Sequence, residues 1–178
     1  MPTPQQARRP RYVDHLLPGA GCSIMGLLAR LMYRALAWKE RQRAQRAALL
    51  QQEERGESEI SDLGVRGETL AYWYLRQAGY TVVARNWRAR AGAGELDLVG
   101  WDGPVLVFVE VKARTSEAAG PPEEAVSPNK QKRVIRAAQE YVRQLGRKPI
   151  NCRFDVVSVS LNPKEGLQVR LLKDAFEA

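Results

Sequence analysis

A charged pair at the end of an apolar strand constrains this chain more than any other feature. Residues 95–101 and 105–113 are two β-rich runs, separated by Asp-Gly-Pro at positions 102–104. Asp-Gly between apolar, β-branched runs is a strong hairpin signal, and the second run is apolar enough for a buried central strand. That run nevertheless ends in Glu110 and Lys112, charges that a buried strand accepts only at a cost. We therefore expect this hairpin to carry function as well as structure.

The hairpin register decides which charged side chains meet. Residues two apart on a strand point to the same face, so Glu110 and Lys112 project together. In one register Asp97 lies diagonal to Glu110, and in a register shifted by two residues it lies directly opposite. Either one gathers Asp97, Glu110 and Lys112 on one face, whereas a shift by a single residue would separate them. Two close carboxylates repel each other, and a divalent cation with oxygen ligands would remove that penalty.

These residues also carry a resemblance to known proteins. Asp97 followed by Glu110-Val111-Lys112 resembles the Asp…Glu-x-Lys signature of the PD-(D/E)XK nuclease superfamily. A wider set resembles the YraN-like family, whose fold is endonuclease-like and akin to archaeal Holliday-junction resolvases. The members of this set are Gly67, Glu68, Tyr80, Asn86, Trp87, Arg88, residues 94–97 and residues 108–114. The resemblance covers about residues 63–171 and implies an α/β, restriction-endonuclease-like core: a helix, a three-strand meander, a helix and a strand.

The resemblance also implies a chemistry, the metal-dependent hydrolysis of phosphodiester bonds in DNA, with branched DNA as one candidate substrate. Asp97, Glu110 and the Val111 carbonyl are then expected to hold Mg²⁺ or Mn²⁺, which activates water. Lys112 is expected to orient that water or to stabilise the developing negative charge. Glu68 is expected to bind a second metal or a metal-bound water; alternatively, it only favours the dipole of its helix.

Composition limits the other chemistries. His15 is the only histidine, which excludes His-based triads and His-containing zinc sites. Cys22 and Cys152 lie far apart and provide neither a disulfide framework nor a metal spacing. We expect reduced thiols in a cytoplasmic protein. A metal in this chain needs oxygen ligands, so Mg²⁺ or Mn²⁺ fits and Zn²⁺ does not.

The positive charge is distributed unevenly. The net charge is +8, and residues 1–50 hold nine Lys or Arg against two Asp or Glu. The rest of the chain is nearly neutral, so nucleic-acid binding there depends on local patches. Six basic residues are candidates for such contacts: Arg88, Arg90, Arg114, Lys130, Lys132 and Arg133. Basic residues at a helix N-terminus oppose the helix dipole, and a bound phosphate backbone would explain them. A solvated charged face is the alternative for these residues. For Trp87, both base stacking and a position in the core remain open.

Residues 1–61 form a basic extension in this interpretation, followed by an endonuclease-like domain over residues 62–178. Residues 1–21 are expected to be disordered, residues 24–46 to form an amphipathic helix, and residues 51–61 to be a linker. The apolar stripe of this helix is Ile24, Leu27, Leu28, Leu31, Met32, Ala35 and Trp38. It is too short to span a membrane. The helix packs on the domain or a partner, lies on a membrane surface, or is weakly ordered.

The spacing of apolar residues predicts the remaining helices and strands. It predicts a helix over 62–78 with Asp62 as its N-cap, a strand over 80–88, the hairpin, a helix over 130–145, a strand over 152–161 and a short edge strand over 167–172. Two alternatives to a nuclease stay open: a nucleic-acid binding module without catalysis, and an adaptor tethered by the extension. The sequence does not indicate the oligomeric state.

Overall fold

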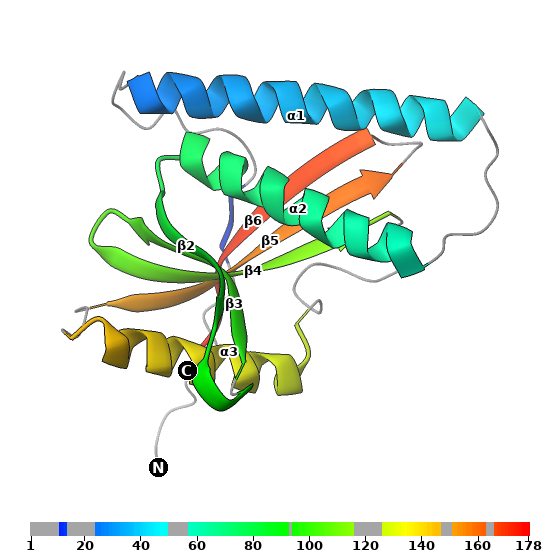
Figure 1. Ribbon diagram of the computed structural model, residues 1–178. Helices are drawn as coiled ribbons and strands as arrows, with labels where there is room; N and C mark the ends of the chain where they lie inside the picture. Colours follow the sequence, from blue (N-terminus) through cyan, green and yellow to red (C-terminus); the bar gives the residue numbers. More distant parts are fainter. Residues whose placement is uncertain are drawn as a thin grey trace, which may run out of the picture.

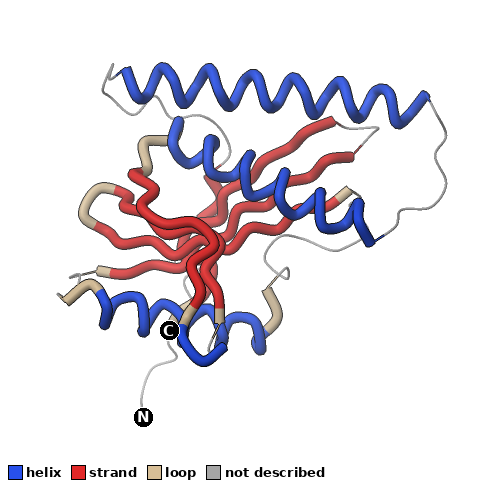
Figure 2. Tube along the Cα trace, in the orientation of Figure 1, coloured by secondary structure: helices blue, strands red, loops and turns tan. Residues whose placement is uncertain are grey.

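A computed structural model of the chain describes residues 11–13, 24–49, 57–92, 94–115, 126–146, 151–162 and 166–178. These residues form a six-stranded mixed sheet with helices on both faces, shown as a ribbon in Figure 1 and as a tube in Figure 2. The helices are α1 (Ile24–Leu49), α2 (Glu57–Gln77) and α3 (Pro128–Gln144), with a 3-10 turn at Arg90–Gly92. The strands are β1 (Arg11–Val13), β2 (Thr81–Arg88), β3 (Glu95–Asp102), β4 (Val105–Arg114), β5 (Cys152–Asn162) and β6 (Gly166–Phe176).

The sheet has the spatial order β1-β6-β5-β4-β3-β2. Strands β2, β3 and β4 form an antiparallel meander, and β5 runs parallel to β4 after the crossover through α3. The order of helix, three strands, helix, strand and strand is the predicted one, and the class is mixed α/β as expected. Because β4 lies in the middle of the sheet, both of its faces are covered, which explains its continuous run of Val, Leu and Phe.

Two apolar layers hold the helices to the sheet, with α1 and α2 on one side and α3 on the other (Figure 1). The layer under α2 contains Leu70, Leu75 and Val109, and the layer under α3 contains Phe108 and Val134. Alternation along β4 sends successive side chains into these two layers. Glu110 follows Phe108 by two residues, so it points toward the α3 side.

A network of ion pairs closes the turn end of the hairpin. The Arg153 guanidinium donates to both carboxylate oxygens of buried Asp155 (2.7 and 2.9 Å) and to Asp102 (2.8 Å), which also pairs with Lys173 (2.8 Å). These cations lower the pKa of Asp102. Burial and the nearby carboxylates raise the pKa of the Tyr80 hydroxyl, which accepts from Arg153. The network ties three strands together at the end opposite Asp97.

Several predicted boundaries need correction. Helix α2 begins at Glu57, so Asp62 is not its N-cap; Asp62 pairs with Arg66 one turn later. Strand β6 is longer than predicted, and it is not at the edge because β1 pairs with it. Of the segment expected to be disordered, residues 11–13 form β1, and the rest lies outside the described residues.

Helix α1 packs against α2 and β6, but with the face opposite to its apolar stripe. Ala29, Ala37 and Glu40 are the buried residues, whereas Ile24 is 86% exposed and Trp38 is 64% exposed. The Glu40 carboxylate pairs with Arg66 of α2. None of the described helices is long and apolar enough to cross a membrane.

Candidate metal and phosphate site

The observed register brings the predicted carboxylates together. Leu98 pairs with Val109, and Asp102 pairs with Val105 across a two-residue turn, so Asp97 falls directly opposite Glu110. The Asp97 Oδ2 atom accepts a hydrogen bond of 2.8 Å from the Val111 backbone N–H, which fixes the carboxylate against β4. The expected convergence of the acidic residues on one face is therefore confirmed.

Glu110 is the centre of the cluster. Its side chain is 2% exposed, and its Oε1 atom lies 2.9 Å from Lys112 Nζ and 3.2 Å from Lys130 Nζ. The Lys112 contact confirms that both charges of the Glu-x-Lys motif share a face. The second oxygen, Oε2, is buried and has no hydrogen-bond partner in the part of the chain that the structure describes. An orphaned buried carboxylate oxygen carries a desolvation cost that a ligand could remove.

Asp97 is held in an environment that opposes its ionisation. Burial, followed by the negative charge of Glu110, raises the pKa of Asp97 from 3.8 to about 7, although the Val111 N–H and Lys130 act in the other direction. The charge of Glu68 on α2 also raises this pKa. Glu68 is half-buried, and its effect on Asp97 makes it part of the electrostatic environment of the carboxylate pair.

The donor set fits a hard divalent cation. Among the described residues, no three His, Cys, Asp or Glu side chains cluster closely enough to form a complete cage. Asp97 and Glu110 instead form a pair, beside the backbone of Val111. Mg²⁺ is commonly bound by one or two carboxylates and keeps several waters or phosphate oxygens as its other ligands. The orphaned Glu110 oxygen and the suppressed ionisation of Asp97 are what such a cation would relieve.

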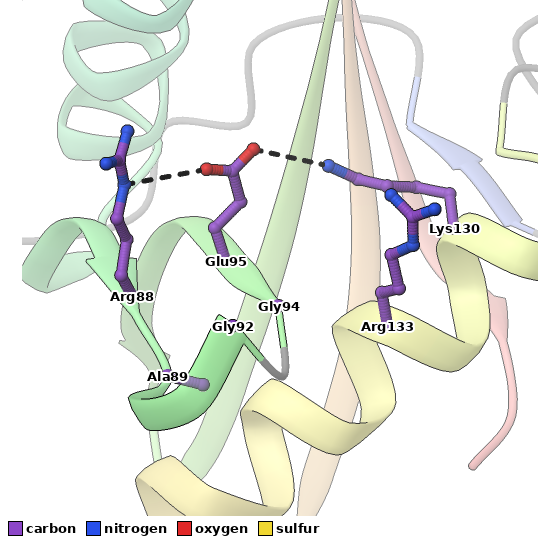
Figure 3. Close-up of a pocket in the computed structure, with 7 residues that line it drawn as sticks. All are labelled: Arg88, Ala89, Gly92, Gly94, Glu95, Lys130 and Arg133. Carbon is purple, nitrogen blue, oxygen red and sulfur yellow. Dashed lines mark ion pairs between the residues drawn. The ribbon is translucent and has the colours of Figure 1, made fainter.

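A pocket of about 490 Å³ is lined in part by Lys130, the lysine that contacts Glu110. In Figure 3, Glu95 of β3 reaches between Arg88 of β2 and Lys130 of α3, with distances of 3.8 and 3.9 Å for the two ion pairs, and Arg133 lies beside Lys130. Three cations around one carboxylate leave a net positive lining, which favours an anion. Lys130 connects the pocket to the carboxylate pair because it contacts both Glu95 and Glu110.

Two glycines allow the elements around the site to approach closely. At Gly94 φ is +142°, and a Cβ there would come within 2.6 Å of the Arg133 carbonyl oxygen. This contact sets α3 against the start of β3. At Gly67 a Cβ would collide with the Cβ of Ala113, so the helix that carries Glu68 lies directly on β4.

The candidate nucleic-acid residues separate into two groups. Arg88, Lys130 and Arg133 line the pocket, whereas Arg90, Arg114 and Lys132 do not. Trp87 is partly buried and packs against the core cluster under α3. Its ring makes an edge contact with the ring of Tyr141 at 5.3 Å between centroids, which favours the core interpretation over base stacking.

Lys130 has a role that the sequence analysis missed. It was expected to contact nucleic acid only, yet it pairs with Glu110. Although burial acts to lower it, the carboxylates of Glu110, Asp97 and Glu95 raise the pKa of Lys130. The signal was present in the sequence, because a lysine in the first turn of a helix opposes the dipole and needs a compensating anion. Glu95 also lies in the pocket, 54% exposed, between two cations.

Comparison with known proteins places the chain. Residues 67–159 match the model of a family described as "Uncharacterised protein family UPF0102". A UPF0102 protein of Symbiobacterium thermophilum is 47% identical over 65% of this chain and 97% of its own length. A UPF0102 protein of Solibacter usitatus is 51% identical over 62% of this chain and 82% of its own length. A UPF0102 protein of Rhodococcus jostii is 45% identical over 64% of this chain and 95% of its own length. The matched region contains the hairpin, the carboxylate pair and the pocket, and the chain belongs to the UPF0102 family.

Proposed function

We propose that the protein is a metal-dependent nuclease of the PD-(D/E)XK type that hydrolyses phosphodiester bonds in DNA. The observation that carries the proposal is the position of Asp97 opposite buried Glu110, whose Oε1 atom contacts Lys112 and whose Oε2 atom has no partner among the described residues. The order of helix, three-strand meander, helix and strand supports a restriction-endonuclease-like core. The resemblance of residues 110–112 to Glu-x-Lys supports the same assignment.

In this proposal Asp97, Glu110 and the Val111 carbonyl hold Mg²⁺ or Mn²⁺. The bound cation lowers the pKa of its water and neutralises phosphate charge. Glu68, whose charge raises the pKa of Asp97, holds an outer water or a second cation in this proposal. The ligand count suits a site whose remaining positions are taken by water and by the scissile phosphate.

The residues of the chain then have separate roles in the displacement. A water oxygen forms a bond to phosphorus while the bond from phosphorus to the leaving sugar oxygen breaks. Lys112 lies 2.9 Å from Glu110, where it orients the water and stabilises the charge that develops on the phosphate. Lys130, Arg88 and Arg133 hold the neighbouring phosphate in the pocket.

Cleavage assays test the proposal directly. Wild type should cleave at least one member of a panel of single-stranded, duplex and four-way-junction DNA in Mg²⁺ or Mn²⁺, and EDTA should stop the reaction. Glu110→Gln keeps the size of the buried side chain and removes its charge, so cleavage should fall by about 10³-fold or more, the scale of losing a central electrostatic group. Glu177→Gln, an exposed position near the C-terminus, is the matched control and should retain activity.

One observation favours a second function, nucleic-acid binding without catalysis. Lys112 and Lys130 already neutralise Glu110, so the cluster is charge-balanced without a metal. If wild type binds the DNA panel in a salt-dependent way but cleaves no member of it, and its stability is unaffected by Mg²⁺ or Mn²⁺, this second function is the correct one.

A further inference from the structure

The outward face of α1 is an apolar stripe that nothing in the described chain covers. Its largest members are strongly exposed: Ile24 86%, Leu27 58%, Leu28 45%, Leu31 55%, Met32 37% and Trp38 64%. The first five recur at intervals of three or four residues, and Trp38 lies two turns after Leu31, so all of them share one face and form a ridge along the N-terminal part of the helix. Contiguous exposed apolar surface of this kind marks an interaction site.

The stripe is exposed because the opposite face of α1 is fixed to the domain. Ala29 and Ala37 are buried there, and the Tyr33 ring makes an edge contact with Tyr74 of α2 at 5.8 Å between centroids. Glu40, 6% exposed, pairs with Arg66. Small residues and a specific ion pair thus select the buried face, while the more apolar face is left outside. The stripe is therefore presented outward by a docked helix.

The charges around the stripe are of one sign. Arg30 and Arg34 lie along one border of the ridge and Lys39 lies along the other, as 100° per residue requires. Arg41 continues the first border. The only acidic residue of α1 is Glu40, which is buried and paired. The outward face of the helix is therefore apolar in the middle and cationic at both borders.

We propose that α1 binds flat on an anionic lipid surface. The apolar ridge would enter the boundary between headgroups and acyl chains, and the long stems of the arginines would let their guanidinium groups reach lipid phosphates. Trp38 lies at the end of the ridge, where an aromatic ring with a polar N–H suits the interface. A second copy of the chain would bring cationic borders against each other, whereas an anionic surface complements both of them.

The position of α1 makes this surface independent of the proposed nuclease site. Helix α1 lies on the α2 side of the sheet, and α3, which carries Lys130 and Arg133, lies on the other side (Figure 1). The family match begins at Gly67, so α1 also lies outside the matched region. A protein docked through α1 would keep its phosphate pocket turned away from the lipid.

Vesicle co-sedimentation of the full chain tests the proposal. Wild type should bind vesicles of phosphatidylcholine with 30% phosphatidylglycerol, a composition that we select for the assay, and should bind pure phosphatidylcholine far more weakly. Leu27→Glu with Leu31→Glu should lower the partition coefficient about 100-fold or more, because two apolar contacts are lost. Val65→Glu places the same charge on an exposed apolar site of α2 and is the matched control.

A charge series completes the test. Arg30→Gln with Arg34→Gln should weaken binding to the anionic vesicles at least about tenfold, given the contribution of each basic residue near such a surface. Arg136→Gln with Arg143→Gln removes the same charge from exposed positions on α3 and should have little effect. Equal losses in both pairs would mean attraction through net charge alone and would overturn the proposal. It would also be overturned if the leucine variant bound like wild type, or if that variant only converted a dimer to a monomer.

Discussion

Replacing Asp97 with Asn should stabilise the metal-free protein, although it removes a proposed metal ligand. Asp97 has a pKa of about 7 in the fold against an ordinary value of 3.8, because it is buried and faces Glu110. Between these two pH values the folded protein keeps a proton that the unfolded chain has released. Unfolding then releases a proton, so raising the pH lowers the free energy of unfolding. At about 1.4 kcal/mol per pH unit, the loss approaches roughly 4 kcal/mol by pH 8.

The substitution isolates this effect because the Asn side-chain oxygen can still accept the Val111 N–H bond. Urea unfolding in EDTA should show nearly equal stability for wild type and Asp97→Asn at pH 4, and a widening advantage of the variant up to pH 8. His15 is the only histidine, so few other groups titrate in this window. Adding Mn²⁺ at pH 8 should stabilise wild type and leave the variant unchanged.

The reasoning would be refuted by a difference between the two proteins that stays below about 1 kcal/mol at every pH, the range of ordinary surface substitutions. A variant that is less stable than wild type at pH 8 in EDTA would show that Lys130 compensates Asp97 more strongly than burial and Glu110 oppose it. Equal stabilisation of both proteins by Mn²⁺ would place the cation elsewhere.

Three further predictions follow from the same contacts. Lys112→Ala should abolish most cleavage but leave Mn²⁺ binding unchanged or tighter, since a cation beside Glu110 is removed; full activity on every substrate would leave the nuclease proposal without its central residue. Lys130→Ala removes the competing cation at the same carboxylate and should tighten Mn²⁺ binding, measured by calorimetry, while weakening DNA binding. Arg153→Met leaves a fully buried carboxylate without its bidentate partner and should cost about 3–5 kcal/mol in urea unfolding, whereas Arg170→Met, at an exposed position, should cost little.

The hairpin could be predicted because its information is local. Gly103 and Pro104 form the two-residue turn between the paired residues Asp102 and Val105, Gly103 adopts a positive φ of 59° there, and the short turn fixes which residues oppose each other. The two registers that differ by two residues both place Asp97, Glu110 and Lys112 on one face, because side chains alternate along a strand with a period of two. The metal chemistry proposed for the pair rests on the residue types alone and stays a prediction.

The orientation of α1 could not be predicted in the same way. Its apolar stripe suggested the buried face, but burial is decided by the partner surface, which the local pattern does not contain. Small side chains at Ala29 and Ala37 let α1 approach α2, and Glu40 finds Arg66 twenty-six positions later in the chain. Both features depend on distant residues. The start of α2 was missed because Asp62, a good N-cap residue, serves as an ordinary helix position that pairs with Arg66.

The two ends of the hairpin show why the site lies where it does. At the turn end, Asp102 and Asp155 receive several bonds from Arg153 and Lys173, so the charges there are satisfied within the fold. At the open end, Glu110 keeps a buried oxygen without a partner among the described residues. An apolar residue at position 110 would avoid this cost, and neighbouring positions of the same strand are apolar. A buried oxygen that the described part of the fold leaves without a hydrogen-bond partner is expected where a ligand completes it, so this oxygen, more than the net charge, argues for a metal-bound phosphate at the proposed site.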